Sequence, residues 1–148
     1  NVQKIVVGKG IGLLAILVIT IGITPAFAAT ELEKTSIGDP QLVNAFGSSL
    51  GNSINVDQQI QISADVMNNQ EKSQKIAYLV QVKDDSGFVV SVKWVVGIIL
   101  NPQQEFTQSV SWIPKEAGEF TAEIFVWEGF PVNHNAIANH RTIQISVS

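Results

Sequence analysis

Two histidines are the first side chains in this sequence that could carry chemistry. His134 and His140 are the only histidines, and they stand just before the last apolar run of the chain. Together with Glu128 or Asn133, they offer the nitrogen and oxygen ligands that a transition metal accepts. Two solvated loop histidines explain the same spacing more simply, because the chain has no Cys to complete a thiolate site. We therefore expect no metal and no cofactor, with His134 and His140 as the candidates to check.

A group of oxygen donors at Asp84, Asp85 and Ser86 forms a second candidate, this time for calcium. Gly87 follows the group, and apolar runs flank it on both sides. Asp-Asp-Ser-Gly between two such runs is typical of a β-hairpin. Turn chemistry therefore accounts for these residues, and we expect a hairpin rather than a calcium site.

Catalytic motifs are missing from the sequence. No Gly-x-Ser-x-Gly elbow is present, and no Ser has an evident His partner that would make it a nucleophile. The many carboxylates include no distinctive apolar-flanked pair for general acid and base catalysis. Gly8-Lys9-Gly10 lies in a targeting segment and is not a phosphate-binding loop. The sequence therefore predicts a protein that is not an enzyme.

The distribution of charge divides the chain into two parts. Of 148 residues, 9 are Lys or Arg and 13 are Asp or Glu. Lys4 and Lys9 are the only charged residues before Thr30, so the remainder has 7 basic and 13 acidic residues, a formal charge of −6. An acidic domain without a basic stripe is not typical of nucleic-acid binding. We expect one acidic domain preceded by an appendage of different character.

Residues 1–29 have the pattern of a secretory signal peptide. A basic start is followed by an apolar run over residues 11–23 and by the small residues Ala26, Ala28 and Ala29. Cleavage after Ala28 or Ala29 would fit this pattern. The main alternative is a retained membrane anchor, since residues 5–29 are long enough to span a bilayer. In an anchor, membrane or helix packing would involve Leu13, Leu14, Ile16, Leu17 and Ile19.

The same segment also resembles the precursors of archaeal type IV pilins, in which Lys9-Gly10 followed by Ile11-Gly12-Leu13-Leu14 would be the cleavage site. That resemblance implies that residues 5–28 stay as a helix in a filament. Pro25 departs from the pattern, because it would end such a helix early. Signal peptide, anchor and pilin all place the domain outside the cytoplasm, secreted or anchored at the cell surface.

After a polar linker at residues 30–36, the chain reads as an all-β domain over residues 37–148. Apolar and polar residues alternate, which indicates strands with one buried face. Residues 75–83 are apolar at both parities, which indicates a central or covered strand. The pattern predicts an immunoglobulin-like antiparallel β-sandwich of about seven strands, at residues 41–46, 56–66, 75–83, 88–100, 106–112, 120–127 and 141–148.

One corner of this sandwich carries a resemblance to a known family. Trp112, Pro114, Ala117-Gly118 and Phe120 resemble the E–F corner of prokaryotic cell-surface Ig-like modules of the CARDB and fibronectin III type. The wider pattern over residues 36–148 resembles small exported Ig-like proteins of ammonia-oxidising archaea. The family often has Tyr where this chain has Phe120, so we expect this corner to be held by packing. The resemblance implies an adhesive, structural or spacer module.

Apolar residues on the outer side of the predicted strands suggest a contact surface. If the Phe120 parity faces the core, Phe125 and Trp127 fall on the opposite face, with Leu79 beside them and Phe130 in the next loop. These four residues are the predicted interaction face. A strand swap, the loop at residues 128–140 or the N-terminal segment could instead cover them. Trp94 is expected to lie in the core.

These observations predict a non-catalytic, extracytoplasmic Ig-like module of the cell surface or envelope that contacts a protein partner or itself. The alternative is a pilin-like filament subunit or a single-span accessory subunit of a membrane complex, with residues 5–28 retained as a helix. No nucleic-acid partner is expected, and membrane contact would be made only through residues 5–28.

Overall fold

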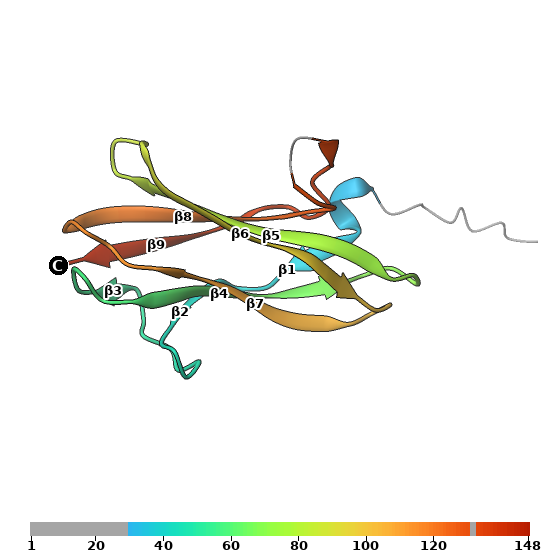
Figure 1. The fold of residues 1–148 in the computed structure, drawn as a ribbon, viewed down its shortest axis with the longest axis horizontal. Helices are drawn as coiled ribbons and strands as arrows, with labels where there is room; N and C mark the ends of the chain where they lie inside the picture. The colour runs from blue at the N-terminus through green and yellow to red at the C-terminus, as the bar shows by residue number, and fades with distance from the viewer. Residues whose placement is uncertain (1–29, 131–132) are drawn as a thin grey trace, which may run out of the picture.

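The computed structural model describes residues 30–130 and 133–148, which form two β-sheets packed face to face (Figure 1). One sheet contains β1 (Thr35–Ile37), β2 (Gln41–Val43), β4 (Ile60–Asn68) and β7 (Glu105–Trp112). The order in the other sheet is β3 (Ser53–Ile54), β9 (Arg141–Val147), β8 (Gly118–Trp127), β5 (Gln74–Asp84) and β6 (Val89–Leu100). The prediction of an all-β sandwich is confirmed, but the sheets are not wholly antiparallel as predicted, because β3 pairs with β9 in the parallel direction.

The predicted alternation selects the core. On β8, the buried residues are Phe120, Ala122, Ile124 and Val126, and β9 contributes Ile143, Ile145 and Val147. Facing residues of β4, including Ile60 and Ile62, complete a core between the two sheets. Side chains that alternate along each strand thus separate one buried layer from two outer faces.

The described residues contain nine strands rather than the predicted seven, because two short strands escaped prediction. β1 has three residues and β3 has two, too few to show alternation. β1 lies partly within the predicted linker, preceded by the 3-10 helix η1 (Glu31–Glu33). The Thr35 backbone N–H and hydroxyl both donate to the Ile137 carbonyl oxygen, at 2.9 and 3.0 Å. This contact and the antiparallel pairing of β1 with β4 both join residues far apart in the chain, and together they hold β1 in place.

The strand predicted from residue 56 begins only at Ile60. Asp57 has φ of 62°, a left-handed conformation that ends an extended run. Gln58 closes the turn, since its backbone N–H donates to the Asn55 carbonyl oxygen at 3.2 Å and its side chain accepts from the Asn55 N–H at 2.9 Å. The turn therefore takes up the first four residues of the predicted strand.

The placement of Trp94 in the core was wrong. Trp94 lies on β6, the last strand of the five-stranded sheet, and 49% of its surface is exposed. Its partner on β5 is Leu79, which points outward, while Tyr78 and Val80 point into the core. The pairing of β6 with β5 is irregular at Gly97. Val96 and Gly97 stand opposite the single residue Ala77, and Gly97 has φ of 77°, as in a β-bulge.

The corner between β7 and β8 is held by aromatic packing, as predicted. The rings of Trp112 and Phe120 meet edge to face, with centroids 5.3 Å apart, and both side chains are buried. Such a pair stabilises a fold by about 0.5–1.5 kcal/mol beyond the area it buries. The two rings lie on opposite sheets and therefore tie the layers together at this end of the sandwich.

The predictions for the N-terminal segment lie outside the described residues. They comprise the signal peptide, anchor or pilin helix over residues 1–29 and the helix-packing residues Leu13, Leu14, Ile16, Leu17 and Ile19. Within residues 30–130 and 133–148, no helix is long and apolar enough to cross a membrane.

Candidate interaction surface

The outer face of the five-stranded sheet brings the predicted contact residues together. Leu79 on β5 pairs with Trp94 on β6 and with Phe125 on β8, and Ala77 pairs with Trp127 in the adjacent row. Neighbouring strands lie about 4.8 Å apart, so side chains within a row touch across three strands. The register therefore makes Leu79, Phe125 and Trp127 parts of one apolar area.

A groove of about 260 Å³ opens on this area, and we call it the aromatic groove. Leu79 is only 8% exposed, so it forms the floor rather than a surface contact. Phe125 and Trp127 are half-buried, whereas Trp94 and Phe130 are exposed. The groove is lined by Leu79, Val80, Gln81, Val92, Trp94, Phe125, Trp127 and Phe130.

The loop before β9 supplies part of this surface and covers another part. The Phe130 ring meets Trp94 edge to face at a centroid distance of 5.1 Å. The His140 ring stacks on Phe125 at 5.4 Å, with 23° between the ring planes. The predicted alternative, in which the loop covers the face within the same chain, therefore holds for Phe125 in part, while the groove between Trp94 and Trp127 stays open.

The opposite end of the same face is polar. Gln81 pairs with Glu123 on β8, and the Lys83 ammonium lies 2.6 Å from a Glu123 carboxylate oxygen. Beyond them, the Thr121 hydroxyl donates to the Gln144 side-chain oxygen at 3.0 Å. A partner laid along β5 would therefore meet aromatic rings at one end and fixed polar groups at the other, which specifies one orientation.

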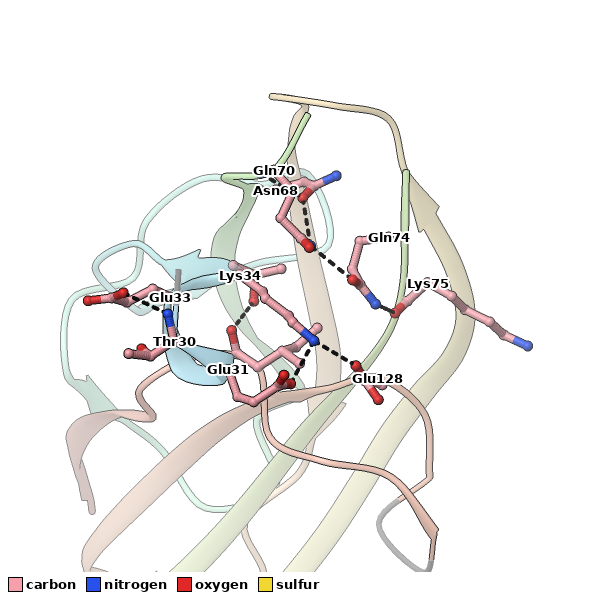
Figure 2. Close-up of polar contacts among 11 residues, drawn as sticks. Thr30, Glu31, Glu33, Lys34, Asn68, Gln70, Gln74, Lys75 and Glu128 are labelled. Atoms are coloured by element: carbon pink, nitrogen blue, oxygen red, sulfur yellow. Dashed lines mark hydrogen bonds and ion pairs between the residues drawn. The ribbon is translucent and has the colours of Figure 1, made fainter. Parts of the chain in front are cut away.

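Contacts from η1 hold the loop that carries Phe130. The Lys34 ammonium lies 2.6 Å from a Glu31 carboxylate oxygen and 3.2 Å from one of Glu128, and so joins the start of the domain to the end of β8 (Figure 2). The hydrogen bond to Glu31 is the main reason that the pKa of Lys34 is raised, and Glu128 adds to it. The Ile137 N–H donates to the Val126 carbonyl oxygen at 3.0 Å, which fixes the far side of the loop.

The two candidate metal ligands have different neighbours. His140 is stacked on Phe125, whereas the His134 ring lies over Gly129, where a Cβ would come within 2.7 Å of His134 Cδ2. Both histidines are exposed. Across the part of the chain that the structure describes, no three His, Cys, Asp or Glu side chains are grouped as metal ligands.

The Asp84 group forms the predicted turn. One Asp84 carboxylate oxygen accepts from the backbone N–H groups of Ser86 and Phe88, at 3.0 and 2.9 Å. Gly87 has φ of 86°, the left-handed conformation that glycine adopts without strain. The carboxylate of Asp84 is therefore used inside the hairpin, as in an Asx turn.

Sequence reasoning missed Val92, Trp94 and His140 as parts of the surface. The sequence pattern predicts a strand for Val92 and Trp94, but alternation alone does not show which strand lies at the edge of a sheet. His140 was considered only as a metal ligand. The signal in the sequence at Val92 and Trp94 is that residues 88–100 are apolar at both parities, a pattern that they share with the covered strand at residues 75–83, and no local signal marks His140.

No protein-family model and no curated protein matches the sequence. Among solved structures, the C-terminal domain of Wzt is similar with a TM-score of 0.66 and 16% identity, over 78% of this chain and 74% of that one. The CARDB domain of the Pyrococcus furiosus PF1109 protein, solved in complex with di-metal ions, is similar with a TM-score of 0.55 and 14% identity, over 81% of this chain and 97% of that one. The β-glucosidase EmGH1 from Erythrobacter marinus is similar with a TM-score of 0.55 and 13% identity, over 77% of this chain and 15% of that one.

The chain is thus structurally similar to CARDB domains and to other Ig-like β-sandwiches. Identities this low show the fold alone, and the same fold serves unrelated activities. The likeness to CARDB domains agrees with the resemblance carried by the corner from Trp112 to Phe120. The narrower resemblance to exported archaeal proteins stays a prediction.

Proposed function

We propose that this protein is a non-catalytic Ig-like module of the cell surface or envelope, and that it binds a protein partner through the aromatic groove. The observation that supports this proposal is the gathering of Trp94, Phe125, Trp127 and Phe130 on one outer sheet face. Trp and other aromatic side chains dominate the energetics of protein interfaces, because they bury a large area at a small cost in conformational entropy. The extracytoplasmic location is proposed from the N-terminal sequence.

Trp127→Ala is expected to weaken partner binding by about 30-fold, the effect of losing a central interface residue worth about 2 kcal/mol. The measurement is saturation binding of labelled full-length protein to an envelope preparation of the source organism. Phe46→Ala is the matched control, because Phe46 is 92% exposed and lies in the loop after β2, away from the groove. Equal binding by wild type and Trp127→Ala would remove the groove from the proposal.

A second candidate function depends on the apolar run at residues 11–23. In this alternative, residues 5–28 remain a helix, and the protein is a filament subunit or an accessory subunit of a membrane complex. N-terminal sequencing of the native protein separates the cases. A start at Ala29 or Thr30 contradicts the alternative, a start at Ile11 supports the pilin form, and an intact N-terminus supports the anchor.

A further inference from the structure

β6 differs from the other strands that lie at the sheet edges. β1 and β2 have three residues each, β3 has two and β7 has eight, whereas β6, with twelve, is the longest edge strand among the described residues. Among residues 30–130 and 133–148, β6 pairs with β5 along one side only, and no described strand pairs with the backbone N–H and C=O groups on its other side. Proteins usually keep edge strands short, charged or interrupted, since a long regular edge invites another strand to pair with it.

The composition of β6 does not protect this edge. Seven large apolar side chains of the strand are exposed by more than a third, on both faces of the sheet; they are Val89, Val90, Val92, Trp94, Val95, Val96 and Ile99. Lys93 is the only charged residue in the strand, and the strand contains no Pro. Two irregularities interrupt the pairing of β6, one at Val90 near its N-terminal end and one at Gly97 near its C-terminal end, and the run from Ser91 to Val95 between them is regular. An apolar, extended partner is therefore the kind that this edge would accept.

We propose that β6 pairs with β6 of a second copy of this chain, antiparallel about a twofold axis, to form one continuous ten-stranded sheet. This inference rests on the proposed function, because it names the contact that brings two grooves side by side on one face. The twofold axis is perpendicular to the sheet, so both copies present the aromatic groove on the same side.

Charge favours a second copy as the partner. The domain from Thr30 onward has a formal charge of −6, which opposes the approach of two copies on most of their surface. β6 has no acidic residue, so pairing there avoids that repulsion. Like charges meet across the interface only in the register that sets Lys93 opposite itself, and every other register separates the two lysines.

The size of the interface sets the strength of the dimer. A twelve-residue strand is about 40 Å long, and one sheet layer is about 10 Å thick, so the edge buries at most about 400 Å² per copy, and less where the irregularities at Val90 and Gly97 break the pairing. That is about half of a standard interface, although Val92 and Trp94 beside the edge enlarge it. We therefore expect a weak dimer that forms as the concentration rises, with dissociation constants of about 10 µM to 1 mM.

Sedimentation equilibrium of the full-length chain over that concentration range tests the proposal. Val95→Lys/Ile99→Lys places a charge on each face of the edge, and neither residue lines the aromatic groove. The double variant is expected to raise the dissociation constant at least tenfold. Phe106→Lys is the control, because Phe106 is a 54% exposed apolar residue on β7 of the other sheet. All variants carry the same residues 1–29, so association through that segment is common to them.

Trp127→Ala separates this inference from the proposed function. Dimerisation kept in Trp127→Ala and lost in the edge variant supports strand pairing. Dimerisation lost in Trp127→Ala and kept in the edge variant overturns strand pairing and leaves the groove as the contact. A wild-type chain that stays monomeric at 1 mM also overturns the dimer. That result leaves the proposed function standing, because the proposed function is tested by binding to the envelope preparation.

Hydrogen exchange gives a readout that does not depend on a variant folding. In the dimer, the β6 amides that point away from β5 become hydrogen-bonded, so exchange in residues 89–100 should slow as concentration rises from about 10 µM to 1 mM. Residues 141–147 of β9, which β8 and β5 separate from β6, serve as the reference and should exchange at a constant rate. Constant exchange in both strands would overturn the pairing.

Discussion

Asn68→Ala is expected to destabilise the protein by about 2–4 kcal/mol, because it leaves several buried backbone groups without partners. Asn68 is fully buried at the end of β4. Its amide nitrogen donates to the carbonyl oxygens of Lys72, Leu100 and Asn101 at 2.7, 3.2 and 3.0 Å. One side chain therefore joins the β4–β5 turn to the β6–β7 turn and so connects the two sheets.

The Asn68 side-chain oxygen extends this connection. It accepts from the Gln70 backbone N–H at 3.1 Å and from the Gln70 amide at 3.3 Å, and the same Gln70 amide reaches Gln74 at 2.9 Å (Figure 2). A buried network of this kind is costly to break at its centre, because each orphaned group loses both its partner and access to water.

Urea unfolding followed by tryptophan fluorescence measures the effect. Asn69→Ala is the matched control, since Asn69 is the next residue, is exposed, and donates its side-chain amide to a single carbonyl oxygen, that of Glu33, at 3.2 Å. The control should change the free energy of unfolding by less than about 1 kcal/mol. A loss in Asn68→Ala no larger than in Asn69→Ala would show that the two turns are held together by other contacts.

The two sheets were predicted from strands that have one buried face and one solvent-exposed face. For those strands the predicted core residues are confirmed. On β8 and β9, every apolar residue of one parity is buried, from Phe120 to Val147. Alternation works there because each strand packs one face on the core and exposes the other. The core can therefore be read from the sequence wherever a strand has a neighbour on both sides and a single buried face.

The same reasoning failed for β6, because an exposed edge strand and a doubly buried strand have the same pattern. β5 and β6 are both apolar at both parities, yet Leu79 is buried and Trp94 is half exposed. What separates them is the position in the sheet, with β5 between β8 and β6. Strand order comes from long-range pairing, which no local pattern contains.

Only part of the contact face could be predicted, because its assembly also depends on the order of the strands. The parity of β8 placed Phe125 and Trp127 outward, but the rows that join them to Trp94 come from pairing between strands far apart in the chain. The stacking of His140 on Phe125 likewise depends on the path of the loop before β9. Side-chain direction is thus a local property, whereas a surface is assembled by topology.

Tyr78 is expected to make the stability of the protein fall steeply above pH 10. The side chain is fully buried on β5, and burial raises the pKa of the Tyr78 phenol well above its ordinary value near 10. The hydroxyl donates to the Ile62 carbonyl oxygen at 3.3 Å, so the folded state holds the protonated form. Above pH 10 the unfolded chain loses this proton and the folded chain keeps it, which favours unfolding.

The loss amounts to about 1.4 kcal/mol per unit of pH between pH 10 and the raised pKa of the folded state, or about 2–3 kcal/mol by pH 12. Tyr78→Phe removes this pH-dependent loss of stability, since Tyr78 is the only tyrosine in the chain. At neutral pH the free energy of unfolding of the variant should be lower by about 0.5–1.5 kcal/mol, because the hydrogen bond to Ile62 is lost. The free energies of unfolding of the two proteins should therefore converge above pH 10, and the variant should become the more stable one.

Absorbance near 295 nm gives an independent check, because the single phenol should ionise only as the protein unfolds. Wild type and Tyr78→Phe differ only in one hydroxyl, so the difference between their pH dependences isolates the phenol. If the free energies of unfolding of the two proteins stay parallel from pH 8 to pH 12, then the Tyr78 phenol ionises in the folded state as readily as in the unfolded state. The close packing between β4 and β5 around Ile62 and Val80 would then have to open on its own, without unfolding of the domain.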